Sequence, residues 1–296
     1  YFKNNQFMTF SAGGNPRTSP AHGYVKGFDR TIYRSFMPAH EVISNFLDHN
    51  LIFKNRDQFC FLQFNELHHN LSVIPEFGVM GNLNSQNISS LLNPVSKKTK
   101  SIWSTKDDNK KKAYIHKIKR LDNYLNIIYQ YLNDNYDQSE ISVCLTGDHG
   151  QSYLSEETHP LNFARTKAIC LFKSGGKKGG HITEYTEGVD IFNTILSDSE
   201  IKFDNNVDGN LPLACGGENK RDYSFSQSFY PGQTYKAVIN SDNGVYYYET
   251  KDLVKDNGYV SHNDYTIKAR ISKNAEKPFS EKDIRKIVTQ KIGIKY

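Results

Sequence analysis

The sequence predicts an α/β protein with a mostly parallel sheet and a small antiparallel subdomain near its C-terminal end. Three apolar runs have the continuous hydrophobic character of buried strands: 59–64, 141–145 and 168–172. Between the first two, apolar residues over 114–132 recur at helical spacing and predict an amphipathic helix of about five turns. Strand, helix and strand in this order are typical of a βαβ unit. Alternating residues on both sides of Asn243-Gly244 predict a β-hairpin over 235–248.

The remaining elements follow from shorter patterns. The first forty residues are rich in Gly, Pro, Ser and Thr, and they allow one short strand at 7–10. A helix is predicted at about 39–49, where Val42, Ile43, Phe46 and Leu47 recur at helical spacing. Two further helices are expected at 189–196 and 280–291.

Length and hydropathy limit the organisation of the chain. Its 296 residues can bury a large core, and we expect a main α/β domain at 1–215 and a small β-hairpin subdomain with a terminal helix at 216–296. No apolar run is long enough to span a bilayer. The sequence starts at Tyr1 without an initiating Met, so targeting information or a membrane anchor could have preceded it.

The charge pattern and the motifs of the chain indicate which partners it can bind. The net charge is +5, and its densest basic segments, 97–100, 110–112 and 117–120, are typical of solvated faces that tolerate an anionic substrate. Zinc-finger spacing and interleaved aromatic and basic residues are both missing from the sequence. We therefore expect no nucleic-acid partner.

The settings of the four cysteines indicate the redox environment of the protein. Cys60, Cys144 and Cys170 lie in apolar runs that resemble central strands, where a thiol acts as a small hydrophobic group. Only Cys215 has a loop-like setting. Cysteines in such settings favour a reducing, cytoplasmic environment, and a periplasmic or membrane-anchored location stays open if upstream sequence is missing.

The segment Thr146-Gly147-Asp148-His149-Gly150 carries the strongest functional signal, because it directly follows the apolar run 141–145. Ligands of α/β sheets usually bind at the carboxyl ends of strands, where Asp148 and His149 are expected. A carboxylate beside a neutral imidazole suits zinc, manganese or a similar divalent ion, and Gly150 allows close approach of the backbone. The alternative is an Asp that caps the next helix beside a surface His.

A second polar cluster, Glu66, His68 and His69, follows the apolar run 59–64. His68 and His69 could instead cap that strand by local hydrogen bonds, and Glu66 could orient a neighbouring group rather than bind a ligand. The Gly-rich segment 175–180 matches neither the P-loop nor the dinucleotide-binding pattern.

Several short motifs, taken in their order and spacing, resemble the sulfatase branch of the alkaline phosphatase superfamily. The motifs are Gly27-Phe28-Asp29, Glu66-Leu67-His68, Tyr114, Leu121-Asp122, Asp148-His149-Gly150, Arg165, Val189 to Leu196 and Asp208-Gly209. The resemblance covers most of the chain. It implies a three-layer α/β/α sandwich of the alkaline phosphatase type.

The resemblance also implies the chemistry of the site. Asp148 and His149 would be ligands of a divalent metal ion, such as zinc, manganese, calcium or magnesium, which activates the nucleophile and neutralises charge on the transferred group. His68 would be a catalytic donor or general acid, and His159 a second catalytic His on the substrate side. For His159, an ordinary Thr-His-Pro turn is the alternative.

Further residues would bind the substrate if the resemblance holds. Arg165, His69 and Glu66 would contact a sulfate or phosphate ester, which could be part of a glycan or linked to a lipid. Two-metal members of the superfamily use a carboxylate near the position of Glu66, which is the alternative role for that residue.

The resemblance implies that the core at 1–215 lacks the first strand of the family and the nucleophile segment after it, so the nucleophile is unassigned. The sulfatase pattern of Cys or Ser followed by x-Pro-x-Arg occurs nowhere in the sequence, and Thr9 and Ser11 are the only hydroxyls near the expected region. Either the chain is an N-terminally incomplete piece of a larger enzyme, or it is a degenerate relative. The start at Tyr1 favours the first interpretation.

Three functions are therefore considered. The first is the C-terminal part of a metal-dependent sulfatase-like enzyme, either a hydrolase or a transferase of phosphoethanolamine or phosphoglycerol groups. The second is a non-catalytic module that binds an anionic glycan or acts as an interaction domain. The third, a two-metal phosphodiesterase or phosphomutase, requires additional Asp and His ligands, whose placement in the sequence does not favour it.

Overall fold

The computed structural model describes residues 1–15, 19–67, 108–151, 155–157, 159–175, 179–203 and 207–292. Within these residues the chain divides into two compact units: unit 1 extends to Ile141, and unit 2 begins at Ser142. The expected domain boundary between residues 215 and 216 stays a prediction.

Unit 1 contains a three-stranded parallel sheet. Its strands are β1 (Met8–Gly13), β2 (Arg30–Tyr33) and β3 (Gln58–Leu62), in the order β2-β1-β3. Phe10 of β1 is in register with Arg30 of β2 and Cys60 of β3. The predicted parallel sheet is thus confirmed in this unit. The sequence prediction missed β2, because a four-residue strand that begins with Arg carries almost no periodic signal.

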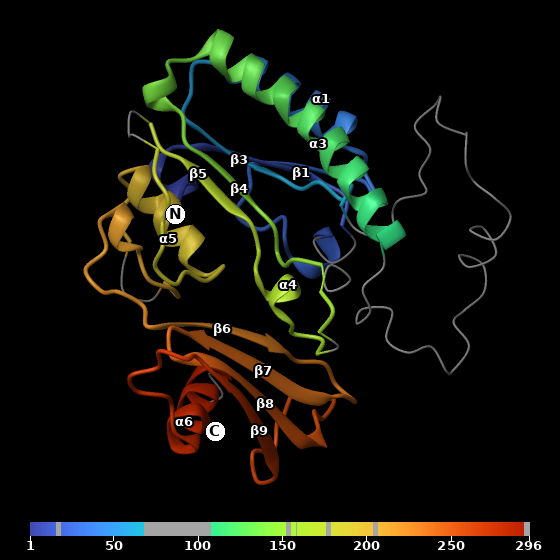
Figure 1. The fold of residues 1–296 in the computed structure, drawn as a ribbon. Helices are drawn as coiled ribbons and strands as arrows, with labels where there is room; N and C mark the ends of the chain where they lie inside the picture. Colours follow the sequence, from blue (N-terminus) through green and yellow to red (C-terminus); the bar gives the residue numbers. More distant parts are fainter. Residues whose placement is uncertain are drawn as a thin grey trace, which may run out of the picture. The chain divides into compact units, whose positions relative to one another are not determined.

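Two helices, α1 (Ala39–Ile52) and α3 (Asp108–Asn135), pack side by side on one face of this sheet (Figure 1). Both helices were predicted, and α3 extends beyond both ends of the predicted range. Since side chains alternate along a strand, Phe10 and Ala12 of β1 face these helices. The core buried there consists of Phe10, Ala12, Met37, Val42, Ile43, Phe46 and Ile128.

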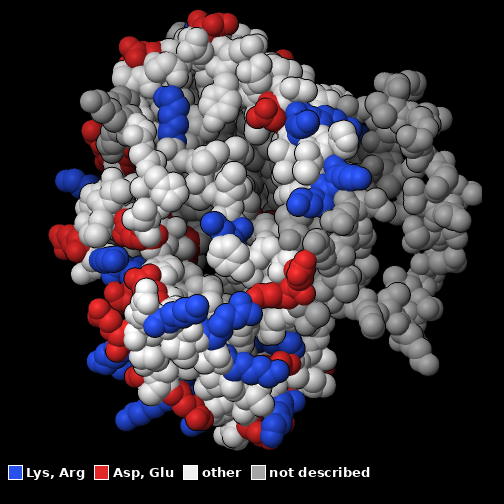
Figure 2. Space-filling model, viewed as in Figure 1, with Lys and Arg blue, Asp and Glu red and all other residues white. Residues whose placement is uncertain are grey.

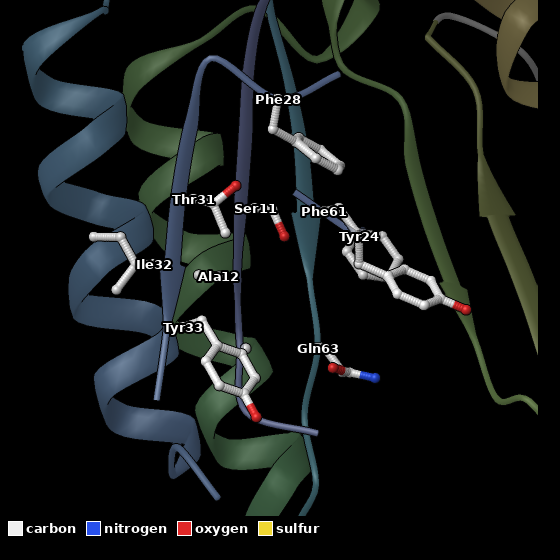
Figure 3. Close-up of a pocket in the computed structure, with 10 residues that line it drawn as sticks. Ser11, Ala12, Tyr24, Phe28, Thr31, Ile32, Tyr33, Phe61 and Gln63 are labelled. Atoms are coloured by element: carbon white, nitrogen blue, oxygen red, sulfur yellow. The ribbon is translucent and has the colours of Figure 1, made fainter. Parts of the chain in front are cut away.

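The opposite face of the sheet is more exposed than predicted. The run 59–64 was expected to form a buried strand, but every residue of β3 is only partly buried or exposed, and Phe61 is 45% exposed. A pocket of about 220 Å³ opens on this face. Figure 3 shows Ser11 and Thr31, on adjacent strands, between the aromatic rings of Phe28 and Tyr33. The continuous apolar run did not reveal this exposure, because unit 1 buries only the alternate positions.

Unit 2 begins with an antiparallel ribbon of β4 (Val143–Thr146) and β5 (Cys170–Lys173). The expectation of a mostly parallel sheet is wrong for this pair. Among the described residues between the two strands, the single-turn helix α4 (Phe163–Thr166) is the only helix, and antiparallel pairing needs no crossover helix. The run 168–172 was also expected to be buried, yet Cys170 and Leu171 are exposed.

The C-terminal part of unit 2 is a four-stranded antiparallel sheet covered by α6 (Glu281–Ile292), as the sequence predicted in outline. Its strands, in spatial order, are β6 (Tyr223–Ser228), β7 (Thr234–Ser241), β8 (Gly244–Leu253) and β9 (Tyr265–Ile271). The predicted hairpin corresponds to β7 and β8. Tyr235, Tyr246 and Tyr248 are buried against Ile284 and Val288 of α6, which explains the aromatic character of this segment.

The remaining helices are short. The predicted helix near 189–196 is α5 (Asp190–Asp198). The described residues also include the 3-10 helices η1 (Lys3–Asn5), η3 (Pro20–His22), η5 (Gln138–Glu140) and η7 (Leu213–Cys215). Among the described residues, none of the helices combines the length and the apolar character needed to cross a membrane. On the face shown in Figure 2, basic side chains lie among acidic ones over the C-terminal sheet.

Candidate metal centre

The end of β4 positions the Asp148-His149 turn. The hydroxyl of Thr146 and the amide of Gly147 both donate to the carbonyl oxygen of Ile169, at 3.0 and 3.1 Å. These two bonds tie the last residue of β4 to the segment that precedes β5. Asp148 and His149 therefore leave the sheet at the carboxyl end of the strand, as the sequence predicted.

Gly150 fixes the other side of the turn. Its amide donates to the carbonyl oxygen of Arg165 at 2.8 Å. A Cβ atom at this position would lie 2.0 Å from the carbonyl oxygen of Ala164, so no side chain fits without displacement of the α4 backbone. The turn is thus held between β5 and α4 by its backbone, and its two side chains are left for other contacts.

A ring nitrogen of His149 and a carboxylate oxygen of Asp148 lie close to each other. The Nδ1 atom of His149 lies 2.8 Å from the carbonyl oxygen of Gly150, a contact that requires the hydrogen on Nδ1 and leaves a lone pair on Nε2. Nε2 lies 3.4 Å from Oδ2 of Asp148. Two ligand atoms that share a tetrahedral zinc ion at about 2.0–2.1 Å lie roughly 3.3–3.4 Å apart.

The hydrogen bond on Nδ1 has a second consequence. A metal-binding His usually donates its other ring N–H to a carboxylate or a backbone carbonyl, which fixes the ring orientation. Here the Gly150 carbonyl performs that function within the same turn. The His149 side chain is 33% exposed and that of Asp148 is 87% exposed, so a cation can reach both.

Arg165 lies beside this turn. Its guanidinium donates to the carbonyl oxygen of Gly150 at 3.4 Å, and its amide is capped by the side chain of Asn162 at 3.0 Å. Burial lowers the pKa of the Arg165 guanidinium, while the negative charge of Asp148 acts in the opposite direction. A positive charge is therefore fixed close to the proposed ligand pair, where it can bind an anionic oxygen.

The described part of the chain adds no further candidate ligand to this pair. Among those residues, no group of three or more His, Cys, Asp or Glu side chains could hold a metal ion. The donor types and their spacing fit a divalent cation, and they constitute half of a typical four-ligand site. The assignment of Asp148 and His149 as metal ligands stays a prediction.

The sequence matches no protein-family model, and no curated protein is significantly similar to it. The functional interpretation therefore depends on the geometry of the described residues and on the motifs of the sequence.

His159 is held against the C-terminal sheet. Its Nδ1 accepts a hydrogen bond from the amide of Leu161 at 3.2 Å, and its ring meets Tyr247 of β8 edge to face, with ring centroids 4.5 Å apart. Burial lowers the pKa of His159, and the nearby carboxylate of Glu249 opposes this shift. The imidazole is thus held neutral near pH 7, with its hydrogen on Nε2.

Tyr247 is a neighbour that sequence reasoning missed. It also donates to Glu157 at 3.5 Å, and Glu157 forms an ion pair with Arg270 at 2.6 Å. The alternation in β8 was an available signal: Tyr246 and Tyr248 face α6, so Tyr247 must face the other side of the sheet.

The second predicted cluster is described only in part. Oε1 of Glu66 accepts a hydrogen bond from the amide of Ala39, the first residue of α1. Glu66 thus caps a helix in unit 1, in line with the alternative that it orients a neighbouring element. His68 and His69 lie outside the described residues, and their roles stay predictions.

Thr9, one of the two hydroxyls considered as a nucleophile, is committed to another contact. Its side chain is buried, and its hydroxyl donates to Asp29 at 2.9 Å. The segment Gly27-Phe28-Asp29 therefore anchors β1. Ser11, the other hydroxyl, lines the pocket on the exposed face of the sheet.

Proposed function

We propose that this chain belongs to a metal-dependent enzyme of the sulfatase type, which cleaves or transfers a sulfate or phosphate ester group. One observation carries the proposal. His149 donates through Nδ1 to the Gly150 carbonyl, and its Nε2 lies 3.4 Å from Oδ2 of Asp148. A divalent cation shared by a carboxylate and an imidazole separates its two ligand atoms by a similar distance, and a backbone carbonyl is a usual partner of the other ring nitrogen.

In this proposal each residue has a defined part. Asp148 and His149 hold the cation, which would lower the pKa of the nucleophile and neutralise charge on the transferred group. Arg165 binds an anionic oxygen of the substrate. His159, neutral and with its hydrogen on Nε2, donates to the substrate, as would His68. Zinc, manganese, calcium and magnesium are all candidates for the cation.

The fold that we propose with this function is the alkaline-phosphatase-like α/β/α sandwich. Support comes from the parallel sheet β2-β1-β3 with α1 and α3 on one face. The Asp-His-Gly turn directly after β4 and the C-terminal antiparallel sheet with α6 add to it. The turn and the C-terminal sheet follow each other along the chain in the order that the resemblance implies.

Metal binding tests the proposal most directly. Zinc and manganese affinities of the full chain are measured by isothermal titration calorimetry, and bound metal is quantified after dialysis. We expect His149→Gln and Asp148→Asn to weaken binding by about ten-fold or more. His181→Gln and Asp256→Asn, at exposed positions of the same unit, are the matched controls. Equal affinities in all five proteins would refute the proposed ligand pair.

A substrate panel separates the reaction classes. The chain, with each of the four cations, is assayed against 4-nitrophenyl sulfate, 4-nitrophenyl phosphate, its diester and a phosphoethanolamine donor with a glycan acceptor. Metal-dependent turnover that Asp148→Asn abolishes supports the proposal. Binding of an anionic glycan without metal and without turnover, unchanged in Asp148→Asn, would favour a binding module instead.

A further inference from the structure

Two cysteines lie next to each other on the ribbon that ends in the Asp148-His149 turn. In the register of β4 and β5, Cys144 is opposite Phe172 and Thr146 is opposite Cys170. Cys144 and Cys170 are therefore diagonal neighbours, and because side chains alternate along a strand, both project from the same face of the ribbon. The sequence placed these residues in two separate apolar runs and provided no sign of the pairing.

The two thiols differ in proton affinity because they interact. The Cys144 thiol donates a hydrogen bond to the sulfur of Cys170, which lowers the pKa of Cys170 to about 7. The same bond, together with burial, raises the pKa of Cys144. Cys170 is exposed and Cys144 is half-buried. The accessible sulfur thus loses its proton more readily than the second sulfur, the usual arrangement of an attacking and a resolving cysteine.

Cys60, unlike Cys170, is an unreactive thiol of the same chain. It lies in β3 and faces the helices of unit 1, and burial raises its pKa to about 12. A thiol in that state behaves as a small apolar group and does not react. The sequence analysis expected this behaviour of Cys60, Cys144 and Cys170 alike.

We propose that Cys144 and Cys170 form a redox-active pair, which a hydroperoxide converts to a disulfide across β4 and β5. The Cys170 thiolate attacks the terminal oxygen of the peroxide, breaks the O–O bond and becomes a sulfenic acid; the leaving oxygen takes a proton as water or an alcohol. Cys144 then attacks the sulfenic sulfur through its own sulfur, and the sulfenic oxygen leaves as water with the proton of Cys144. Two thiols lose two electrons in total, and the peroxide gains them.

The ribbon permits the approach that the disulfide needs. Diagonal Cβ atoms in an antiparallel pair lie up to about 7 Å apart, and a disulfide requires roughly 4 Å, so the strands must shift locally. Four residue pairs hold β4 to β5, and among the described residues neither strand pairs with a third. Such a short two-stranded ribbon is easily deformed. A thiol reductant restores the pair by exchange.

Peptide mapping of the full chain tests the pair. The reduced protein is treated with one equivalent of hydrogen peroxide, alkylated and digested with trypsin. Cleavage after Arg120, Arg165, Lys167 and Lys173 places the two cysteines in separate peptides, 121–165 and 168–173. We expect these two peptides to appear linked, and the link to disappear after treatment with dithiothreitol. Cys60→Ser and Cys215→Ser are the controls and should form the link in the same yield.

Single variants identify the order of the steps. Cys144→Ser should leave a sulfenic acid at Cys170 that dimedone traps, whereas Cys170→Ser should give neither trapped adduct nor disulfide. In untreated protein at pH 7, iodoacetamide should modify Cys170 roughly five-fold faster than an ordinary exposed cysteine, because the larger thiolate fraction outweighs its lower nucleophilicity. Circular dichroism confirms that each variant is folded.

Three results would overturn the proposal. One is a disulfide in which Cys144 or Cys170 pairs with Cys60 or Cys215 as often as the two pair with each other. Another is a dimer linked through two copies of Cys170 as the main product on a non-reducing gel. The third is a link between 121–165 and 168–173 that forms only in urea.

Discussion

Thr9 and Asp29 bind each other through four hydrogen-bond contacts. The amide and the hydroxyl of Thr9 both donate to the Asp29 carboxylate, at 3.0 and 2.9 Å. The Asp29 amide donates back to the hydroxyl and to the carbonyl oxygen of Thr9, at 2.9 and 3.0 Å. Lys3 adds an ion pair at 2.6 Å. The segment that the sequence presented as a family motif therefore joins the central strand β1 to the loop before β2.

The first prediction concerns acid stability of this contact. The hydrogen bond from Lys3, followed by those from Thr9, lowers the pKa of Asp29 to about 2. A depressed carboxyl pKa contributes stability above the unfolded value of about 4, and this stability is lost as the pH falls toward 2. Asp29→Asn should remove about 1 to 2 kcal/mol at pH 7, after allowance for partial exposure, and much less at pH 2.

Urea unfolding at pH 7 and pH 2, followed by hydrogen exchange of the β1 peptide, checks this. Asp48→Asn, on the exposed side of α1, is the control and should not appreciably change the free energy of unfolding at either pH. If Asp29→Asn lowered the free energy of unfolding equally at both pH values, the low pKa of Asp29 would not be the source of this stability.

The second prediction concerns His49, a buried histidine of α1. Its ring stacks on Phe10 with centroids 4.2 Å apart, and neither ring nitrogen has a hydrogen-bond partner among the described residues. Burial, with a smaller effect of the Arg30 charge, lowers its pKa to about 4. Because the unfolded chain binds this proton at about pH 6.5, stability should fall between pH 6.5 and pH 4, by about 2 to 3 kcal/mol.

His49→Phe should remove that pH dependence and stabilise unit 1 at pH 7 by about 1 kcal/mol, because no unpartnered polar atom is then buried. Thermal unfolding between pH 4 and pH 7 measures both effects. His40→Phe, at an exposed position of the same helix, should leave the pH dependence intact. Retention of the full acid sensitivity in His49→Phe would show that another group is responsible.

The third prediction concerns a buried ion cluster in unit 2. Arg221 pairs with Glu187 at 3.1 Å and with Asp190, and all three side chains are at most 10% exposed. Lys291 of α6 also pairs with Glu187, at 2.8 Å. The cluster joins α5, the segment before β6 and the terminal helix. Arg221→Met leaves two buried carboxylates without their shared cation and should cost about 3 to 5 kcal/mol.

Chemical unfolding monitored by circular dichroism measures the decrease in the free energy of unfolding. Hydrogen exchange should show that the weakened regions are α5 and α6. Lys220→Met, at the exposed neighbouring position, should change stability by less than about 0.5 kcal/mol. Adding Asp190→Asn to Arg221→Met should recover part of the loss, since one uncompensated charge is removed. A double variant less stable than Arg221→Met would contradict the electrostatic explanation.

The fourth prediction concerns the backbone of the proposed metal turn. A Cβ atom at Gly150 would lie 2.0 Å from the carbonyl oxygen of Ala164, whereas one at Gly147 would lie 3.6 Å from its nearest neighbour, the carbonyl oxygen of His149. Gly150→Ala must therefore displace the turn, and Gly147→Ala need not. We expect Gly150→Ala to weaken zinc or manganese binding by about ten-fold or more, and Gly147→Ala by less than about two-fold.

Calorimetric titration of both variants provides the comparison. Equal affinities would mean that the position of the Asp148-His149 turn does not govern metal binding.

The parts of the fold that could be predicted are those with a strong local period. The spacing of Val42, Ile43 and Phe46 predicted α1, and the alternation around Asn243-Gly244 predicted β7 and β8. The strand end before Asp148 was likewise visible in the sequence. In each case the signal comes from side chains a few residues apart, and the local backbone alone decides which face they occupy.

The sequence by itself thus determined the hairpin of β7 and β8, the helices that cover the parallel sheet, and the placement of Asp148 and His149 at the end of a strand. Only the tertiary structure decided that β5 runs antiparallel to β4, that Cys170 is exposed beside Cys144, and that His159 packs on Tyr247. These contacts join residues far apart in the chain. Periodicity reports which face of an element is apolar, but it does not report which other element that face meets.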